Sequence, residues 1–224
     1  MRLAGVVVVA ALGVRVARSR HRRSLHPAGH SFAGELEVWG LPERVGSTLV
    51  DEPGRHSATV RFSKGAGTRG DLPDVLGLAI RAGGRDLLLS TAGTGRLTRH
   101  LPAPRRTFDT RYGSIVPYRT GSGHSLYLAA GPDPEGVPFG RTLASVVAAA
   151  ESDRAALLLY AGGEPFGRVS LGPVLSAEVD GELAFDPVRN APADLRPALL
   201  ATLRAVTYRV SRWWRGATVR VRES

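Results

Sequence analysis

The chain has 224 residues, of which 43% are hydrophobic and 22% charged, as in an ordinary globular domain large enough for a core of its own. It contains no cysteine, which excludes disulfide frameworks, zinc–thiolate sites and thiol catalysis. The net charge is +10, but the basic residues are almost all arginine, scattered along the chain with few aromatic residues between them, so we do not expect nucleic-acid binding.

The N-terminus is apolar at residues 3–14 (LAGVVVVAALGV) and basic at residues 15–23 (RVARSRHRR). The apolar stretch is too short to span a bilayer, which takes about 20 residues. Arginines also stand where a secretory signal would carry its small-residue cleavage site. We expect residues 1–22 to form an extension of a cytoplasmic protein, with residues 3–14 packed on the domain or lying on a membrane surface.

Beyond residue 30 the pattern is typical of β-strands. We expect strands at 34–40, 57–63, 75–82, 85–91, 113–120, 125–131, 155–162 and 167–179. Turns are predicted at Gly83–Gly84, at 121–123 and at 162–167, and one short helix at 141–150. Eight closely spaced strands, mostly in hairpins, predict a mainly β fold with some α, an eight-stranded antiparallel β-barrel.

The periodicity becomes helical at residue 193, and we expect a helix over 193–216 that begins near Asp194. Steps of four and seven residues place Arg204, Tyr208 and Arg215 on one face of this helix. An arginine-rich chain can produce such a stripe by chance, so the stripe alone assigns no function. The predicted domain is therefore a barrel followed by one C-terminal helix, over residues 23–220.

Five short blocks give the stripe a context. The stretch 23–38 (RSLHPAGHSFAGELEV) carries an arginine three residues before a histidine and then a Gly/Ala-rich turn. Four blocks follow, namely VRFS with a later AG (60–67), GLAIR (77–81), DL (86–87), and FDPVRN (185–190) with R-x-x-x-Y (204–208). In this order they resemble the blocks of the haem catalases and of the smaller catalase-related peroxidases. The resemblance implies a catalase-like barrel that binds haem b.

The resemblance also implies roles for residues of the expected helix. Tyr208 would be the metal ligand, the axial ligand of the haem iron. A guanidinium one helical turn away favours the phenolate that ferric iron requires, and Arg204 is at that distance. Arg23, Arg61 and Arg215 would each hold a haem propionate, because a guanidinium matches a carboxylate.

Three further residues would form the peroxide side of such a site. The resemblance makes His26 the base that moves a proton between the two peroxide oxygens, and Ser63 its hydrogen-bond partner. Ser90 stands where the family has an asparagine, and its hydroxyl donates from a shorter arm. Phe108 is the candidate for the aromatic residue that stacks on the haem. His30, His56, His100 and His124 show no metal-ligand spacing and are expected at the surface.

Three functions stay open at this point. The first is a haem-dependent peroxidase with at most modest catalase activity, which would use hydrogen peroxide or organic hydroperoxides and an electron donor that the sequence does not identify. The second, motivated by Ser90, is a non-catalytic haem carrier or sensor. The third is a haem-less barrel that binds a small apolar ligand, and the set of arginines argues against it. The oligomeric state is not predictable from the sequence.

Overall fold

The computed structural model describes residues 28–198 except 94, 96, 188 and 189. The N-terminal extension and most of the predicted C-terminal helix therefore lie outside the described residues. Within the described range no helix is long and apolar enough to cross a bilayer.

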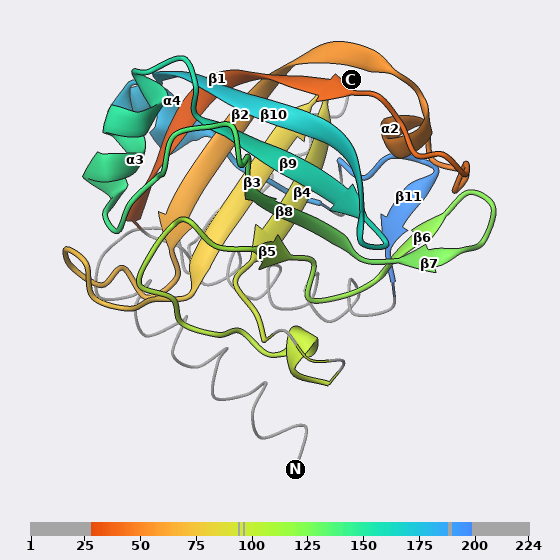
Figure 1. Ribbon diagram of the computed structural model, residues 1–224, viewed down its shortest axis with the longest axis horizontal. Coiled ribbons are helices and arrows are strands. Elements are labelled where there is room, and N and C mark those ends of the chain that lie inside the picture. The colour runs from red at the N-terminus through yellow and green to blue at the C-terminus, as the bar shows by residue number, and fades with distance from the viewer. Residues whose placement is uncertain (1–27, 94, 96, 188–189, 199–224) are drawn as a thin grey trace, which may run out of the picture. The chain divides into compact units, whose positions relative to one another are not determined.

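Eight antiparallel strands close into a barrel in the order β1-β10-β9-β8-β5-β4-β3-β2 (Figure 1). These strands are β1 (Ala28–Val38), β2 (Gly54–Lys64), β3 (Leu76–Ala82), β4 (Arg85–Ser90), β5 (Tyr112–Gly113), β8 (Leu128–Pro132), β9 (Ala156–Ala161) and β10 (Glu164–Val174). The prediction of a mainly β, eight-stranded antiparallel barrel is confirmed.

The inside of the barrel is filled by aromatic and aliphatic side chains. Phe62 of β2 lies at the centre, with ring centroids 5.1 to 6.3 Å from those of Phe32, Phe108, Tyr112 and Phe139. All five rings are fully buried. Because successive side chains of a strand point to opposite faces, the neighbours of Phe62 in β2 face outward.

The hairpin turns follow from glycine pairs. Gly83 and Gly84 join β3 to β4 with φ of 55° and 75°, and Gly162 and Gly163 join β9 to β10 with φ of 63° and 112°. Two-residue turns of this kind need positive φ, which glycine adopts without strain. The β9–β10 turn is thus shorter than the predicted 162–167.

The two strands predicted at 113–120 and 125–131 are each divided. After β5 the chain leaves the barrel, forms β6 (Tyr118–Thr120) and β7 (Ser125–Leu126), and returns as β8. The turn at 121–123 is confirmed, with Thr120 N donating to His124 O at 2.9 Å. Pro117 lies at the break, and a proline cannot donate to a strand ladder.

Short helices occupy several connections. They are α2 (Thr48–Asp51), the 3-10 turn η1 (Thr98–His100), α3 (Leu143–Ala150) and α4 (Ala177–Glu182). The helix predicted at 141–150 is confirmed as α3, and Thr142 and Ser145 cap it reciprocally. The strand predicted at 167–179 ends at Val174, because Ser176 accepts a hydrogen bond from Val179 N and starts α4.

The predicted start of the C-terminal helix near Asp194 is wrong. Leu195–Pro197 form strand β11, which pairs with β6 in a three-stranded sheet with β7. Asp194 does not cap its own segment, because its Oδ2 accepts a hydrogen bond from Thr48 N at 2.6 Å, at the start of α2. The polar signal at this position therefore serves a distant element.

Candidate functional site

One row of small residues crosses the outside of five neighbouring strands. In the strand register Gly29 of β1 faces Ser63 of β2, which faces Gly77 of β3, then Ser90 of β4 and Gly113 of β5. We call these five residues the glycine–serine row. Neighbouring strands lie about 4.8 Å apart, so the row extends roughly 19 Å across the barrel wall.

The row faces away from the barrel interior. Phe62, one residue before Ser63, lies in the aromatic core and is in register with Leu78 and Leu89. Residues in register on antiparallel strands share a face, and residues next in sequence take the other face. The row is therefore a strip of outer wall that has no side chain larger than a hydroxymethyl group.

The structure brings together the two predicted catalytic serines, Ser63 and Ser90, on either side of Gly77. Both residues are buried. The Ser63 hydroxyl donates to Gly77 O at 3.3 Å. The Ser90 hydroxyl forms no hydrogen bond with any residue that the structure describes, so it is the polar group of the row that a ligand can engage.

The two ends of the row differ sterically. A Cβ atom on Gly113 would meet nothing within 4 Å. A Cβ on Gly29 would lie 2.4 Å from Phe62 O and 2.8 Å from Cζ of Arg61. Glycine at position 29 thus lets the Arg61 side chain lie directly against β1, while Gly113 leaves room on the outer face of β5.

Arg61, a predicted propionate-binding residue, lies on the same outer face as Ser63 and is 5% exposed. Its Nε donates to Asp180 Oδ1 at 3.1 Å, and the hydroxyl of Ser31 donates to the same oxygen at 2.5 Å. Asp180 belongs to α4, which the sequence patterns did not predict. This carboxylate orients the guanidinium and holds α4 against β1 and β2.

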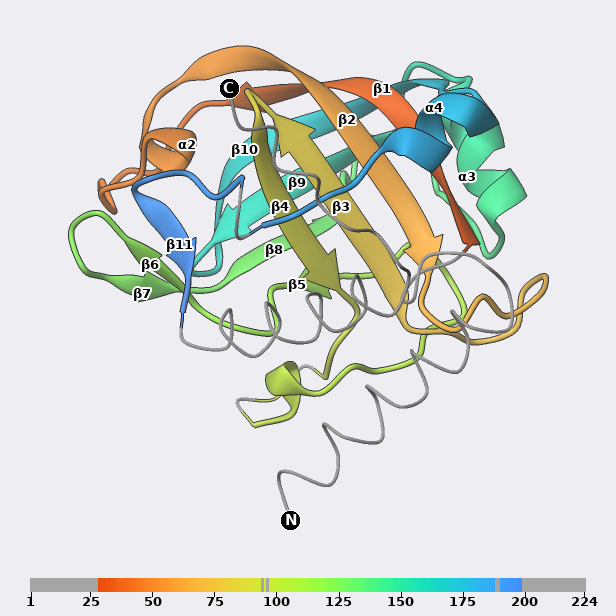
Figure 2. The same cartoon turned by 180° about the vertical axis from the view of Figure 1, so that it is seen from behind.

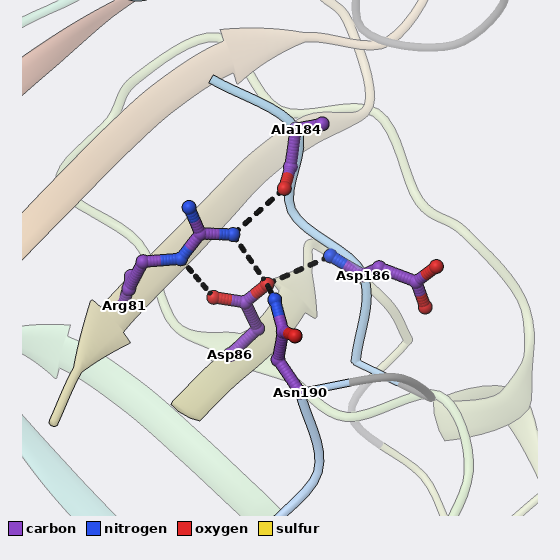
Figure 3. A network of polar contacts seen from close by, with 5 residues as sticks. All are labelled: Arg81, Asp86, Ala184, Asp186 and Asn190. Carbon is purple, nitrogen blue, oxygen red and sulfur yellow. Dashed lines mark hydrogen bonds and ion pairs between the residues drawn. The ribbon is translucent and has the colours of Figure 1, made fainter. Parts of the chain in front are cut away.

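A second polar cluster lies farther along the outer face of β3 and β4 (Figure 3). Asp86, which is fully buried, accepts hydrogen bonds from Arg81 Nε at 2.6 Å and from Arg81 Nη2 at 2.7 Å. It also accepts from Asp186 N at 2.7 Å and from Asn190 Nδ2 at 2.8 Å. The hydrogen bond to Asp86 is the main cause that raises the pKa of Arg81 above its usual range.

This Arg81–Asp86 cluster attaches a late segment of the chain to the barrel. Arg81 Nη2 also donates to Ala184 O at 2.7 Å, and Asp86 N donates to Asn190 O at 3.0 Å. The guanidinium lies 5.0 Å from the ring centroid of Phe185. Figure 2 shows the segment after α4 crossing the outside of β3 and β4. Three of the sequence blocks, 77–81, 86–87 and 185–190, thus meet in one cluster.

Several predicted residues cannot be compared with the structure. Arg23, His26, Arg204, Tyr208 and Arg215 lie outside the described residues. Their roles remain predictions.

Phe108 lies in the core of the barrel. It is fully buried in the barrel core, 5.8 Å from Phe62 between ring centroids, and so lies on the opposite side of the wall from the glycine–serine row. The loop containing Phe108 folds back into the barrel, because Phe108 N donates to Gly140 O at 2.8 Å. The role of Phe108 as the aromatic residue that stacks on the haem stays a prediction.

The described residues hold no cluster of three or more His, Cys, Asp or Glu side chains that could bind a metal ion. His30, His56, His100 and His124 are exposed, as expected. Tyr112 does not qualify as a phenolate ligand, because burial raises the pKa of its phenol well above 10 and its hydroxyl donates to Phe108 O within the core.

Two solved structures share this fold. Over 90% of this chain, catalase A from Saccharomyces cerevisiae is similar with a TM-score of 0.62 and 14% identity. A fungal catalase covers 89% of the chain with a TM-score of 0.59 and 14% identity. The chain spans 63% and 61% of the lengths of these two proteins. No family model matches the sequence, and no curated protein matches it. The chain thus has the catalase-type barrel fold.

Proposed function

We propose that this protein binds haem b against the glycine–serine row and acts as a haem-dependent peroxidase with at most modest catalase activity. The observation that carries the proposal is the row itself, a strip of small residues with two serine hydroxyls on the outer wall of a catalase-type barrel.

The residues of the row fit a flat, largely apolar ligand with a reactive centre. Without large side chains, Gly77 and Gly113 let a planar group approach the backbone of β3 and β5. Next to the row, Ala79 of β3 and Leu88 of β4 are half-buried and apolar on the same face. The buried Ser90 hydroxyl, without a partner among the described residues, needs an acceptor, which a bound peroxide oxygen supplies.

Charged residues would hold the haem propionates and the haem iron. Arg61, together with Arg23 and Arg215, would bind the haem propionates, because a guanidinium matches a carboxylate. Tyr208, ionised with the help of Arg204, would bind the iron. A ferric haem held in this way supplies the redox chemistry that peroxide reduction requires.

The proton in this chemistry would be moved by His26. Only Pro27 separates His26 from Ala28 at the start of β1, so the two Cα atoms are at most about 7 Å apart. Neutral imidazole accepts the proton of one peroxide oxygen and returns it to the departing oxygen as the O–O bond breaks. Ser63 would fix the orientation of this ring, and Ser90 would donate a hydrogen bond to the peroxide.

The position of Ser90 also favours a second function, a haem carrier or sensor without turnover. The short hydroxymethyl arm reaches less far from the wall than an amide, and losing an oriented donor typically costs about 3 kcal/mol in the transition state. A carrier would bind haem stoichiometrically and give no peroxide turnover above that of free haem. A His26→Ala variant would then have the same activity as the wild type.

The test is to titrate the full-length protein with haem and record its absorption spectrum. We expect a ferric Soret band at one haem per chain, its loss in Tyr208→Phe, and its retention in the matched control Tyr160→Phe. Oxygen release and oxidation of a generic aromatic donor are then measured on the loaded protein. The proposal fails if no Soret band forms or if Tyr208→Phe binds haem like the wild type.

A further inference from the structure

Loops from two hairpins meet at one end of the barrel and expose large apolar side chains. The loop 65–75 joins β2 to β3, and the loop 91–111 follows β4 and contains η1, both at the lower end of the barrel in Figures 1 and 2. Asp74 and Arg105 tie the loops together by two backbone hydrogen bonds of 3.1 and 2.8 Å. The two loops therefore form one surface, which we call the leucine–arginine end.

Three leucines are exposed on this surface. Leu97 is 85%, Leu101 61% and Leu72 54% exposed. Leu97 and Leu101 flank the single turn of η1, and Leu101 N donates to Thr98 O at 2.9 Å, which fixes both leucines on one tight turn. Of the six large apolar side chains that are exposed within the described residues, three thus lie at this end.

The loop that carries two of these leucines is strongly basic. Between Asp86 and Asp133 the sequence has six arginines and a single acid, Asp109. The Asp109 carboxylate is engaged within the fold by Phe139 N at 2.6 Å, Gly140 N at 2.9 Å and the Thr107 hydroxyl at 3.0 Å. Its one negative charge offsets only one of the six arginines.

Four of these arginines, Arg99, Arg105, Arg106 and Arg111, form no ion pair with a carboxylate among the described residues. Arg99 and Arg111 are instead held on aromatic faces, 4.9 Å from the Tyr127 ring centroid and 4.4 Å from that of Tyr160. Arg99 lies in η1 between Leu97 and Leu101, so its charge is fixed beside these two leucines.

We propose that the leucine–arginine end is a docking surface for an anionic lipid bilayer. Leu97, Leu101 and Leu72 would insert at the level of the head groups, and the arginines would bind the lipid phosphates and carboxylates. On the two loops six arginines outnumber three acids, Asp71, Asp74 and Asp109, which favours an anionic partner. Nucleic-acid phosphates would give no reason to expose leucines.

The absence of cysteine permits a direct test in the full-length chain. Single cysteines are introduced as Leu97→Cys, Leu101→Cys and, at the opposite end of the barrel, Trp39→Cys, and are labelled with a polarity-sensitive fluorophore. Trp39 is the matched control because it is also a large exposed apolar residue, at 45%. With vesicles of phosphatidylcholine and phosphatidylglycerol, we expect a blue shift at 97 and 101 and none at 39.

Co-sedimentation with the same vesicles gives the affinity. We expect Leu97→Ser/Leu101→Ser to weaken binding roughly tenfold or more, Trp39→Ser to leave it unchanged, and vesicles of phosphatidylcholine alone to bind weakly. The proposal is overturned if the protein binds no anionic vesicles, or if it binds them while the label at 97 stays in water, which would assign binding to another segment. It is equally overturned if a duplex oligonucleotide binds and the vesicles do not.

Discussion

Two regions of the same outer wall have opposite chemical character. At the Arg81–Asp86 cluster a buried carboxylate has four hydrogen-bond donors, and the segment 184–190 is tied to the barrel. At the glycine–serine row, on the same strands, the side chains are minimal and the Ser90 hydroxyl has no partner among the described residues. The Arg81–Asp86 cluster attaches one segment of the chain to another. The glycine–serine row, with its small side chains and the Ser90 hydroxyl, instead suits a ligand.

The largest effect on stability is expected from a substitution in the Arg81–Asp86 cluster. Asp86→Ala removes the acceptor of Arg81, Asp186 N and Asn190 Nδ2, and leaves the Arg81 charge without its partner. We expect a loss of about 3 kcal/mol in the free energy of unfolding, measured by urea denaturation. The control Glu37→Ala breaks an exposed ion pair with Arg55 and is expected to cost much less, because solvent screens such pairs. Equal losses in the two variants would show that the cluster does not anchor the segment.

The two ends of the glycine–serine row provide the next comparison. Gly29→Ala forces a Cβ against Phe62 O, so we expect a loss of about 1–3 kcal/mol in the free energy of unfolding. Gly113→Ala meets nothing within 4 Å and is expected to unfold like the wild type. Thermal unfolding of both variants checks this, and similar losses would mean that the outer face of β5 is as crowded as that of β1.

Changes at Ser90 should affect function much more than stability. Because its hydroxyl has no partner among the described residues, Ser90→Ala is expected to change the free energy of unfolding by less than about 0.5 kcal/mol. Ser90→Asn lengthens the donor arm and is expected to raise oxygen release from peroxide by roughly a hundredfold in the haem-loaded protein. If Ser90→Asn folds and leaves oxygen release unchanged, residue 90 does not contact the peroxide.

The smallest effect is expected in the stability at acid pH, and it arises at Asp133, away from the glycine–serine row. The pKa of Asp133 lies below 3.8: burial alone would raise it, but hydrogen bonds from Arg168 and from Glu135 N outweigh that cost. A lowered folded pKa adds stability at pH values above the unfolded pKa, and this contribution disappears as the pH falls through the folded value. Asp133→Asn should therefore lose less stability than the wild type below about pH 4.

Ser90→Ala should follow the wild-type acid curve throughout. Urea denaturation at pH 3 to 6 measures both variants. A changed acid dependence in Ser90→Ala would mean that the row contributes to the titration and is not the neutral strip described above.

The strands and the main hairpins were predictable because their signals are local. Alternation marks β2 and β3, and Gly83–Gly84 can only be a tight turn. The elements that were missed depend on contacts distant in sequence. Asp194 has the pattern of a helix start but caps α2, and the Asp180 carboxylate that holds Arg61 lies in a helix started by a single serine.

The candidate site was predictable only in part. Ser63 and Ser90 were found from motif order, and the strand register places them in one row. Their glycine neighbours at 77 and 113 were not identified as a site, because only pairing across strands brings them together. The core position of Phe108 was not predictable, because its sequence position does not reveal that its loop returns to the core.

The central claim is that the glycine–serine row is the haem-binding face. It is tested most directly by haem titration of Gly113→Leu beside Gly181→Leu, the second being a glycine of α4 that is equally open to a side chain. We predict that Gly113→Leu weakens haem binding roughly tenfold or more while the barrel stays folded, and that Gly181→Leu binds haem like the wild type. Unchanged haem affinity in a folded Gly113→Leu protein would contradict the account.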